Sequence, residues 1–364
     1  MGGSFEFVHE MYAQRVVFGP GSARSRLAEE VQRLNGTNVL LDVSEGERPL
    51  AEELTRGLPV VGRVDEVRMH VPVSVAEAAR RRANDVGAHL LLSIGGGSAV
   101  GTAKAVALTS GIPVLAVPTT YAGSEATPVW GLTDAGRKTT GTDARVLPRT
   151  VIYDAELSVT LPVGLSVASG LNALAHCVDS QWAPRADPIN RALALEGARA
   201  LTEGLRLVHA DPGGLAGRSE CLYGAYLAAL SFASAGSGLH HKICHVLGGT
   251  WDLPHAQTHA VVLPHVLAFN APSAPEAATR MAAALGTGDA LAALLDLEDD
   301  LEAPTSLREL GMPEDAIPKA AALVAEAAPQ DNPRPVDQAS AEELLRSAWA
   351  GRSALRSHPH LGER

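Results

Sequence analysis

The stretch Ser93-Ile94-Gly95-Gly96-Gly97-Ser98 decides how the first part of the chain is expected to fold. It follows the apolar run Leu90–Leu92, which predicts a buried strand, and precedes a helical pattern over Thr102–Leu108. A glycine loop in this position lets backbone N–H groups approach a phosphate closely, and the helix N-terminus adds favourable partial charge. The spacing is not GxGxxG, because Val100 stands where the third glycine would be. We interpret the loop as phosphate-binding; a tight turn without a ligand is the alternative.

A second loop with polar character follows the next apolar run, Pro113–Pro118. It is rich in hydroxyl groups and small residues, and it stands at the carboxyl end of an expected parallel strand, where α/β proteins bind ligands. Its hydroxyls could instead satisfy the loop's own backbone. As cofactor-binding residues from this loop we predict Thr119, Thr120 and Ser124.

Apolar runs and amphipathic segments alternate up to Tyr153. This alternation predicts a mostly parallel sheet that helices cover on both faces. The strands expected are Gln14–Phe18, Asn38–Val43, Glu66–Val71, His89–Ile94, Pro113–Pro118 and Thr150–Tyr153.

From Ser166 onward, Ala- and Leu-rich stretches repeat at helical period without a convincing strand. With 364 residues the chain is long enough for two domains. We therefore expect an α/β, Rossmann-like dinucleotide-binding domain over 1–157 and an all-α catalytic and substrate domain over 158–364.

Composition excludes several classes of protein. The formal net charge of −11 argues against nucleic acid as the main partner, because phosphate binding needs a basic face. No apolar stretch approaches the roughly 18 residues of a membrane span, and the first residues carry no signal-peptide pattern. Three cysteines fit neither a disulfide framework nor a CxxC site. These features indicate a cytoplasmic protein.

Histidines are concentrated in one segment, since six of the 13 in the chain lie between residues 240 and 265. His241 and His245 are four residues apart and would share one face of a helix, as would Asn172 and His176 further upstream. Three histidines and one oxygen ligand make a plausible divalent metal site. Position 172 is an amide, however, so the expected carboxylate is missing. Single histidines are usually surface or satisfied core residues; the cluster favours a site.

Taken together, the glycine loop, the Pro118–Glu125 loop and the histidine segment resemble the iron-type alcohol dehydrogenase superfamily over nearly the whole chain. The resemblance implies a dehydroquinate synthase-like fold with a nicotinamide cofactor on the first domain. The positions that match the family's metal ligands are Asn172, His176, His241 and His255. His245 matches a histidine beside the reaction centre.

Finer motifs resemble the maleylacetate reductase branch of that superfamily. They are Thr119–Glu125, Val146–Asp154, Ser169–Ala173, Gly238–Gly249 and Asp331–Pro335. The Asn at 172 is a trait of that branch, whose members are regarded as metal-free, so the resemblance implies that no metal is required and that the four matching positions form a vestigial site.

The branch reduces the carbon–carbon double bond of maleylacetate to give 3-oxoadipate, in aromatic-compound degradation. Negative charge then develops on the ketone oxygen and must be stabilised. We predict that His241, Lys242 and His245 do this, one histidine also supplying the proton, with Tyr121 as a second proton donor. The substrate is a small dicarboxylate that needs basic partners, for which Lys242, His240, Arg145 and Arg149 are candidates. Predicted substrate-binding residues are Asn172, His176, His240, His255 and Arg145.

The resemblance also implies NADH as cofactor, with NADPH as an alternative, and a homodimer. Asp42 is the acidic candidate for the adenosine ribose, although it lies one or two residues early, and Ser44 could accept a 2′-phosphate. The main rival function is an Fe- or Zn-dependent alcohol dehydrogenase or aldehyde reductase of the same superfamily. A lyase of the dehydroquinate-synthase branch and a non-catalytic cofactor-binding module are more remote rivals.

Overall fold

The computed structural model describes residues 6–64, 66–134 and 137–357. Its contacts divide the chain into two compact units. The sheet unit consists of Ala13–Gly170 and Glu203–Tyr226, and the helical unit of Met1–Tyr12, Leu171–Thr202 and Leu227–Arg364. The domain boundary at 157/158 stays a prediction.

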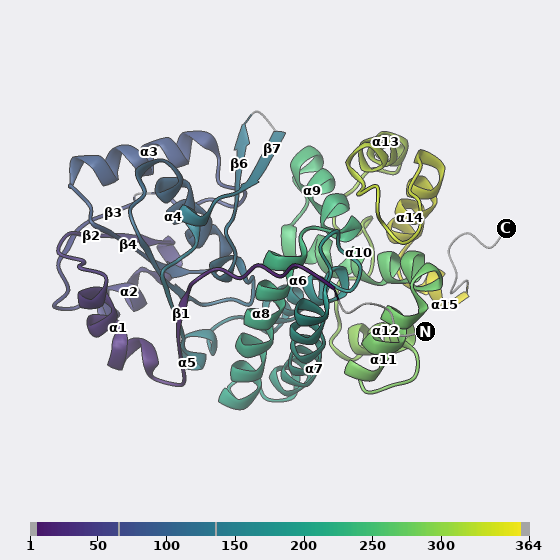
Figure 1. The fold of residues 1–364 in the computed structure, drawn as a ribbon, viewed down its shortest axis with the longest axis horizontal. Coiled ribbons are helices and arrows are strands. Elements are labelled where there is room, and N and C mark those ends of the chain that lie inside the picture. Colours follow the sequence, from purple (N-terminus) through teal and green to yellow (C-terminus); the bar gives the residue numbers. More distant parts are fainter. Residues whose placement is uncertain (1–5, 65, 135–136, 358–364) are drawn as a thin grey trace. The chain divides into compact units, whose positions relative to one another are not determined.

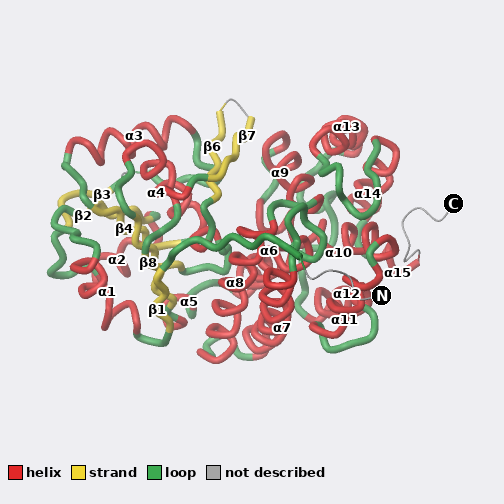
Figure 2. Tube along the Cα trace, in the orientation of Figure 1, coloured by secondary structure: helices red, strands yellow, loops and turns green. Residues whose placement is uncertain are grey.

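The sheet unit is built on six parallel strands (Figures 1 and 2). They lie in the order β1-β8-β5-β4-β2-β3, so the chain crosses the sheet several times. The strands are β1 (Arg15–Phe18), β2 (Val39–Val43), β3 (Val60–Arg63), β4 (Leu90–Gly95), β5 (Val114–Pro118) and β8 (Thr150–Tyr153). This arrangement confirms the expected α/β domain.

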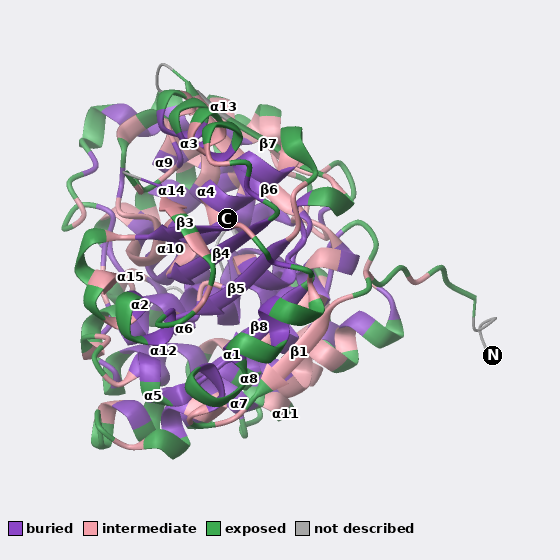
Figure 3. Cartoon of the chain, turned by 90° about the vertical axis from the view of Figure 1, so that its left-hand side faces the viewer, coloured by how far each residue is buried: buried purple, intermediate pink, exposed green. Residues whose placement is uncertain are grey.

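The central strands are buried on both faces, as Figure 3 shows for β4 and β5. On one face, Leu41 and Leu92 join a core with residues of α1 (Ser22–Arg33) and α2 (Arg48–Leu54). On the other, Leu40 and Leu91 join a core with α3 (Val73–Asp85) and α4 (Gly97–Ser110). Continuous apolar runs in the sequence follow from this burial, because alternation is lost when both faces are covered.

Two details of the sheet unit differ from expectation. The strand predicted at Glu66–Val71 is wrong: the edge strand is β3, Val60–Arg63. His70 and Val71 have positive φ angles of 61° and 44°, which no strand can contain. The sequence also did not suggest the antiparallel hairpin of β6 (Val129–Asp134) and β7 (Arg137–Thr142).

The helical unit contains no strand among its described residues, in agreement with the all-α expectation (Figure 2). The later helices are α9 (Leu239–Trp251), α10 (His255–Asn270), α11 (Pro275–Ala284), α12 (Ala290–Asp300), α13 (Ile317–Ala327), α14 (Gln338–Ala350) and α15 (Ser353–Ser357). The main core of the unit is formed by buried side chains of α9, α10, α13 and α14. The units share α6 (Val163–Asp179), α7 (Pro188–Ala210) and α8 (Leu215–Ala235).

No helix within the described ranges is both long and apolar enough to cross a membrane.

Candidate active site

The glycine loop joins β4 to α4, as predicted. Gly95 ends the strand with a φ of +148°, Gly96 is the N-cap, and Gly97 and Ser98 open the helix. A β-carbon on Gly95 would lie 2.5 Å from a carboxylate oxygen of Glu47, so a larger residue could not be placed there without displacing that side chain. The first-turn amides of α4 therefore stand at the end of a tight turn, the arrangement that binds phosphate groups.

The predicted hydroxyl-rich loop packs directly on the glycine loop. Gly95 and Pro118 are register partners in β4 and β5, and the loop continues from there. A β-carbon on Gly96 would meet Cγ2 of Thr120 at 2.9 Å, and one on Gly97 would meet Cβ of Ala122 at 3.2 Å. The structure thus brings the two loops together at the carboxyl edge of the sheet, where the sequence placed them.

Glu47 is a residue that the sequence reasoning missed. Its carboxylate accepts hydrogen bonds from the hydroxyl of Thr119 and, at 2.8 Å, from that of Ser44, and it lies against Gly95. It therefore links the ends of β2, β4 and β5. Its position, four residues after Val43 at the end of β2, gave no signal, since acidic residues are common in surface turns.

Asp42, predicted to contact the ribose, is placed differently. It lies within β2 opposite Ser93, and its side chain is 1% exposed. Burial raises the pKa of this carboxyl well above its ordinary value. Neither carboxylate oxygen has a hydrogen-bond partner among the described residues. This placement does not support a contact with the cofactor.

In the helical unit, aromatic rings stack around the predicted histidines. His176 on α6 lies against Phe232 of α8 and His241 of α9, with ring centroids 4.7 and 4.8 Å away, and those two rings also contact each other at 4.5 Å. Burial, and then the neighbouring His241, lower the pKa of His176 well below its ordinary value. The His176 ring is therefore neutral at pH 7, the form that can bind a metal or donate a single hydrogen bond.

Asp179 holds His241 in place, and the sequence reasoning also missed it. His241 Nδ1 donates to the carboxylate at 2.7 Å, and the backbone N–H groups of Gly238, His240 and His241 donate to it at 3.1 to 3.4 Å. Asp179 is fully buried at the end of α6 and so both caps α9 and fixes the tautomer of His241. Its spacing of three residues from His176 was the only available signal.

Three further buried side chains form a compact group of potential metal ligands: His240, Cys244 and His259. Their ligand atoms lie within 4.8 Å of one another. His240 Nε2 and His259 Nδ1 are hydrogen-bonded at 2.9 Å. Burial lowers the pKa of His240 to about 3 and that of His259 well below the ordinary value, so both rings are neutral.

The other predicted residues lie partly in the helical unit and partly in the sheet unit. Lys242, His245 and His255 are partly exposed on α9 and α10, close in sequence to the buried histidines. Asn172 is buried, and its Oδ1 lacks a hydrogen-bond partner within the described ranges. These residues belong to the same helical unit as His241.

Arg145, Arg149 and Tyr121 belong to the sheet unit. Arg145 and Arg149 are exposed, and Arg145 is paired with Asp143 at 2.6 Å. Tyr121 is completely buried, and its hydroxyl accepts a hydrogen bond from Arg218 at 3.1 Å. These contacts do not favour Arg145 as a carboxylate ligand or Tyr121 as a proton donor; both roles stay predictions.

The chain matches two family descriptions over most of its length. Residues 13–155 match iron-containing alcohol dehydrogenase, and residues 166–349 match the C-terminal region of the Fe-containing alcohol dehydrogenase family. The chain belongs to the iron-containing alcohol dehydrogenase family. This confirms the resemblance that the glycine loop and the histidine segment suggested.

Relatives within the family include several maleylacetate reductases. That of Sphingobium indicum is 47% identical over 348 residues, which cover 95% of this chain and 98% of the relative. That of Burkholderia cepacia is 44% identical with the same coverage. Among solved structures, maleylacetate reductase from Agrobacterium tumefaciens has a TM-score of 0.90 at 41% identity, covering 95% of this chain and 99% of that one. An iron-containing alcohol dehydrogenase from Corynebacterium glutamicum has a TM-score of 0.94 at 54% identity, with coverage of 97% and 99%.

The expectation that no metal is required is wrong. The family is described as iron-containing, and the structure contains a group, His240, Cys244 and His259, that could hold a metal ion. The expectation rested on one substitution, the amide at position 172. A buried amide oxygen still offers a lone pair, and nitrogen and sulfur donors suit iron and zinc without a carboxylate.

Proposed function

We propose that this protein is a maleylacetate reductase. The observation that carries the proposal is its 47% identity to the maleylacetate reductase of Sphingobium indicum over nearly the full length of both chains. The enzyme is an NAD(P)H-dependent oxidoreductase. It transfers a hydride from NAD(P)H to the alkene carbon of maleylacetate that is β to the ketone. The resulting enolate takes a proton at the α carbon, giving 3-oxoadipate and NAD(P)⁺.

The cofactor binds to the sheet unit in this proposal. The amides of Gly96, Gly97 and Ser98 receive the pyrophosphate, and the hydroxyls of Thr120 and Ser124 add donors. Support comes from the packing of the two loops at the carboxyl edge of the sheet, where open α/β sheets bind their ligands.

The helical unit supplies the groups that act on the substrate. His241, Lys242 and His245 are assigned to the developing oxyanion and the proton, and His240, His176 and His255 line the substrate region. Asp179 keeps the proton of His241 on Nδ1, so that the unprotonated Nε2 is left to accept a hydrogen bond or to bind an ion. Lys242 supplies positive charge for a carboxylate within a protein of net charge −11.

The four positions that match the family's metal ligands, Asn172, His176, His241 and His255, fit a divalent ion. Asn172 Oδ1 and His176 Nδ1 lie one helical turn apart, both buried and without a hydrogen-bond partner among the described atoms. His241 is the third ligand in this proposal and His255 the fourth. The Asp179 carboxylate orients His241 through Nδ1, and ligating histidines usually have such a partner on their other ring nitrogen. We favour this set over His240, Cys244 and His259, because two members of that group already share a hydrogen bond. A bound ion would act as a Lewis acid on the ketone oxygen.

The test is an assay of NAD(P)H oxidation with maleylacetate as substrate, followed at 340 nm. The wild-type protein should oxidise the cofactor with maleylacetate and not with simple aldehydes. His241→Ala and His245→Ala should each lower kcat about a hundredfold, the usual loss when a general acid or base is removed. Oxidation with aldehydes alone would contradict the proposal and favour an alcohol dehydrogenase. Unchanged kcat in both variants would contradict the roles assigned to His241 and His245.

Several finer features complete the proposal. We assign residues 1–157 to the cofactor-binding domain and 158–364 to the catalytic domain. We place the protein in the cytoplasm, as a homodimer that serves the degradation of aromatic compounds. Sedimentation of the purified protein tests the dimer.

A further inference from the structure

Four large side chains that are fully buried in the sheet unit belong to one loop or to hydrogen bonds that hold it. They are Arg218, Tyr121, Tyr153 and Lys104, the four largest fully buried side chains among the described residues. The loop they serve runs from Thr119 to Thr127 and carries the hydroxyls assigned above to the cofactor. Two of the four, Arg218 and Lys104, are basic, and burying a basic group costs more free energy than burying an apolar one. Burial lowers the pKa of Lys104 to about 7.

Arg218 holds the first half of the loop through Tyr121. Its Nη1 donates to the Tyr121 hydroxyl at 3.1 Å and to Ser166 Oγ at 2.7 Å, and its other donors reach the carbonyls of Leu161 and Pro212. The backbone N–H of Tyr121 donates to Ser169 Oγ at 3.0 Å. Tyr121 is therefore fixed at its amide by α6 and at its hydroxyl by α8.

Lys104 holds the second half of the loop. It lies two turns into α4, and its Nζ donates to the carbonyls of Ser124 at 2.5 Å, Thr127 at 2.8 Å and Val129 at 2.8 Å. Between these carbonyls, the buried carboxyl of Glu125 accepts from the Tyr153 hydroxyl at 2.8 Å. The helix that opens with the glycine loop thus also fastens the neighbouring loop.

We propose that Arg218 and Lys104 are positioning residues that hold the Thr119–Thr127 loop in the shape that receives the nicotinamide cofactor. The inference rests on the proposed function. Because Thr120 and Ala122 already lie against Gly96 and Gly97 at close van der Waals contact, a small displacement of the loop would close or open the phosphate region. Side chains with several hydrogen-bond donors suit this task, since hydrogen bonds fix direction as well as distance, which apolar packing does not.

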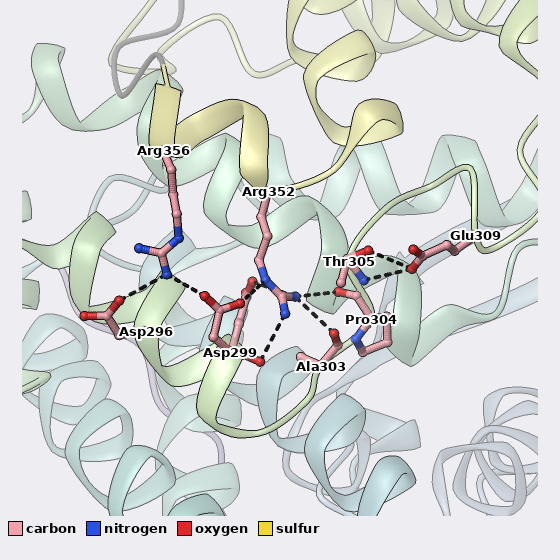
Figure 4. Close-up of polar contacts among 9 residues, drawn as sticks. Asp296, Asp299, Ala303, Pro304, Thr305, Glu309, Arg352 and Arg356 are labelled. Atoms are coloured by element: carbon pink, nitrogen blue, oxygen red, sulfur yellow. Dashed lines mark hydrogen bonds and ion pairs between the residues drawn. The ribbon is translucent and has the colours of Figure 1, made fainter.

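The test compares Arg218→Met and Lys104→Met, which keep an unbranched side chain that can pack in the core and remove the donors, with a matched control. The control is Arg352→Met. Arg352, in the helical unit, likewise donates to the backbone carbonyls of Ala303 and Pro304 and pairs with Asp299 (Figure 4). Each purified variant is titrated with NAD(P)H by fluorescence, assayed for kcat and both KM values, and melted.

We expect the two loop variants to weaken NAD(P)H binding at least tenfold and to raise the KM for the cofactor more than the KM for maleylacetate. Arg218→Lys, which keeps a donor, should recover part of the affinity. Arg352→Met should lower Tm and leave the NAD(P)H Kd unchanged. Arg218→Met and Lys104→Met variants that lose Tm as the control does, but bind NAD(P)H within twofold of wild type, would overturn the proposal.

Tyr121→Phe keeps the test decisive if a methionine variant does not fold. It removes only the hydroxyl that Arg218 holds, and we expect weaker cofactor binding. A fall in kcat with an unchanged Kd would contradict the positioning role and support Tyr121 as a proton donor instead. A wild-type protein that does not bind NAD(P)H would contradict the proposed function, whereas failure of this inference alone leaves wild-type binding intact.

Discussion

At the scale of single residues, the Asp179 carboxylate both caps α9 and orients His241. It accepts three backbone N–H groups at the start of α9 and the ring N–H of His241. Removing the negative charge would weaken the cap and leave the His241 tautomer undefined. Mutation of a carboxylate that orients a ligating or catalytic histidine usually lowers metal affinity or activity about tenfold to a hundredfold.

Asp179→Asn should therefore lower kcat about ten- to a hundredfold while the NAD(P)H Kd stays constant. Asp187→Asn is the matched control, because Asp187 also accepts from a histidine, His9 at 2.7 Å, and from amides at the start of α7. Steady-state kinetics and melting curves separate the two effects. Equal loss of kcat in both variants would mean that Asp179 acts on stability alone.

The burial of Asp42 predicts how the stability of the protein depends on pH. Because burial raises its pKa in the folded protein, the unfolded chain releases this proton at lower pH than the folded one. Its contribution to stability is complete below the unfolded pKa of about 3.9 and is lost as pH rises through the folded pKa. Asp42→Asn should thus gain Tm relative to wild type on going from pH 5 to pH 8, with an unchanged cofactor Kd. A constant Tm difference, or a weakened Kd, would favour the ribose role instead.

At the scale of elements, the sequence predicted strands and loops where local pattern decides them. The apolar runs before Gly95 and Thr119 are buried on both faces, so β4 and β5 were found within a residue of their ends. Glu66–Val71 has apolar residues but contains two left-handed backbone angles, which depend on tertiary contacts of Val71 with Thr133. Asp179, Arg218 and Lys104 were missed for a related reason, since their partners are distant in sequence.

The start of α9 offers a prediction at this scale. A β-carbon on Gly238 would lie 2.5 Å from Oδ1 of Asp179, so α9 approaches α6 closely only because this residue is glycine. Gly238→Ala should separate the carboxylate from His241 and reduce kcat about tenfold or more. Gly164→Ala is the control, because that helical glycine has open space around its β-carbon position and should tolerate alanine. Unchanged kcat in Gly238→Ala would show that α9 can shift without breaking the contact between Asp179 and His241.

At the scale of the whole molecule, metal binding is linked to stability. An ion that binds only the folded chain stabilises it by about 2.7 kcal/mol at a concentration of 100 Kd. Anaerobic addition of Fe²⁺ should therefore raise Tm by several degrees, and a chelator should reverse the change. His176→Ala should abolish this shift, while His265→Ala, which removes a buried histidine bonded to Ser347, should retain it.

Two outcomes would change this account of the metal. Loss of the Tm shift in Cys244→Ser but not in His176→Ala would place the ion at His240, Cys244 and His259. Absence of any shift in the wild-type protein would contradict metal binding altogether. The sequence predicted His176, His241 and His255 as positions that match metal ligands and gave His259 no role. The choice between the two sets depends on which nitrogens already have partners in the folded protein.

The buried anchoring of the Thr119–Thr127 loop has a thermodynamic consequence. A loop that is already ordered before its ligand arrives loses little conformational entropy on binding. The heat capacity change of NAD(P)H binding should then reflect only the surface that the cofactor itself covers, without the larger negative value of coupled folding. In this enzyme the ordering is complete when the chain has folded, so the cofactor meets a surface that does not need to be formed.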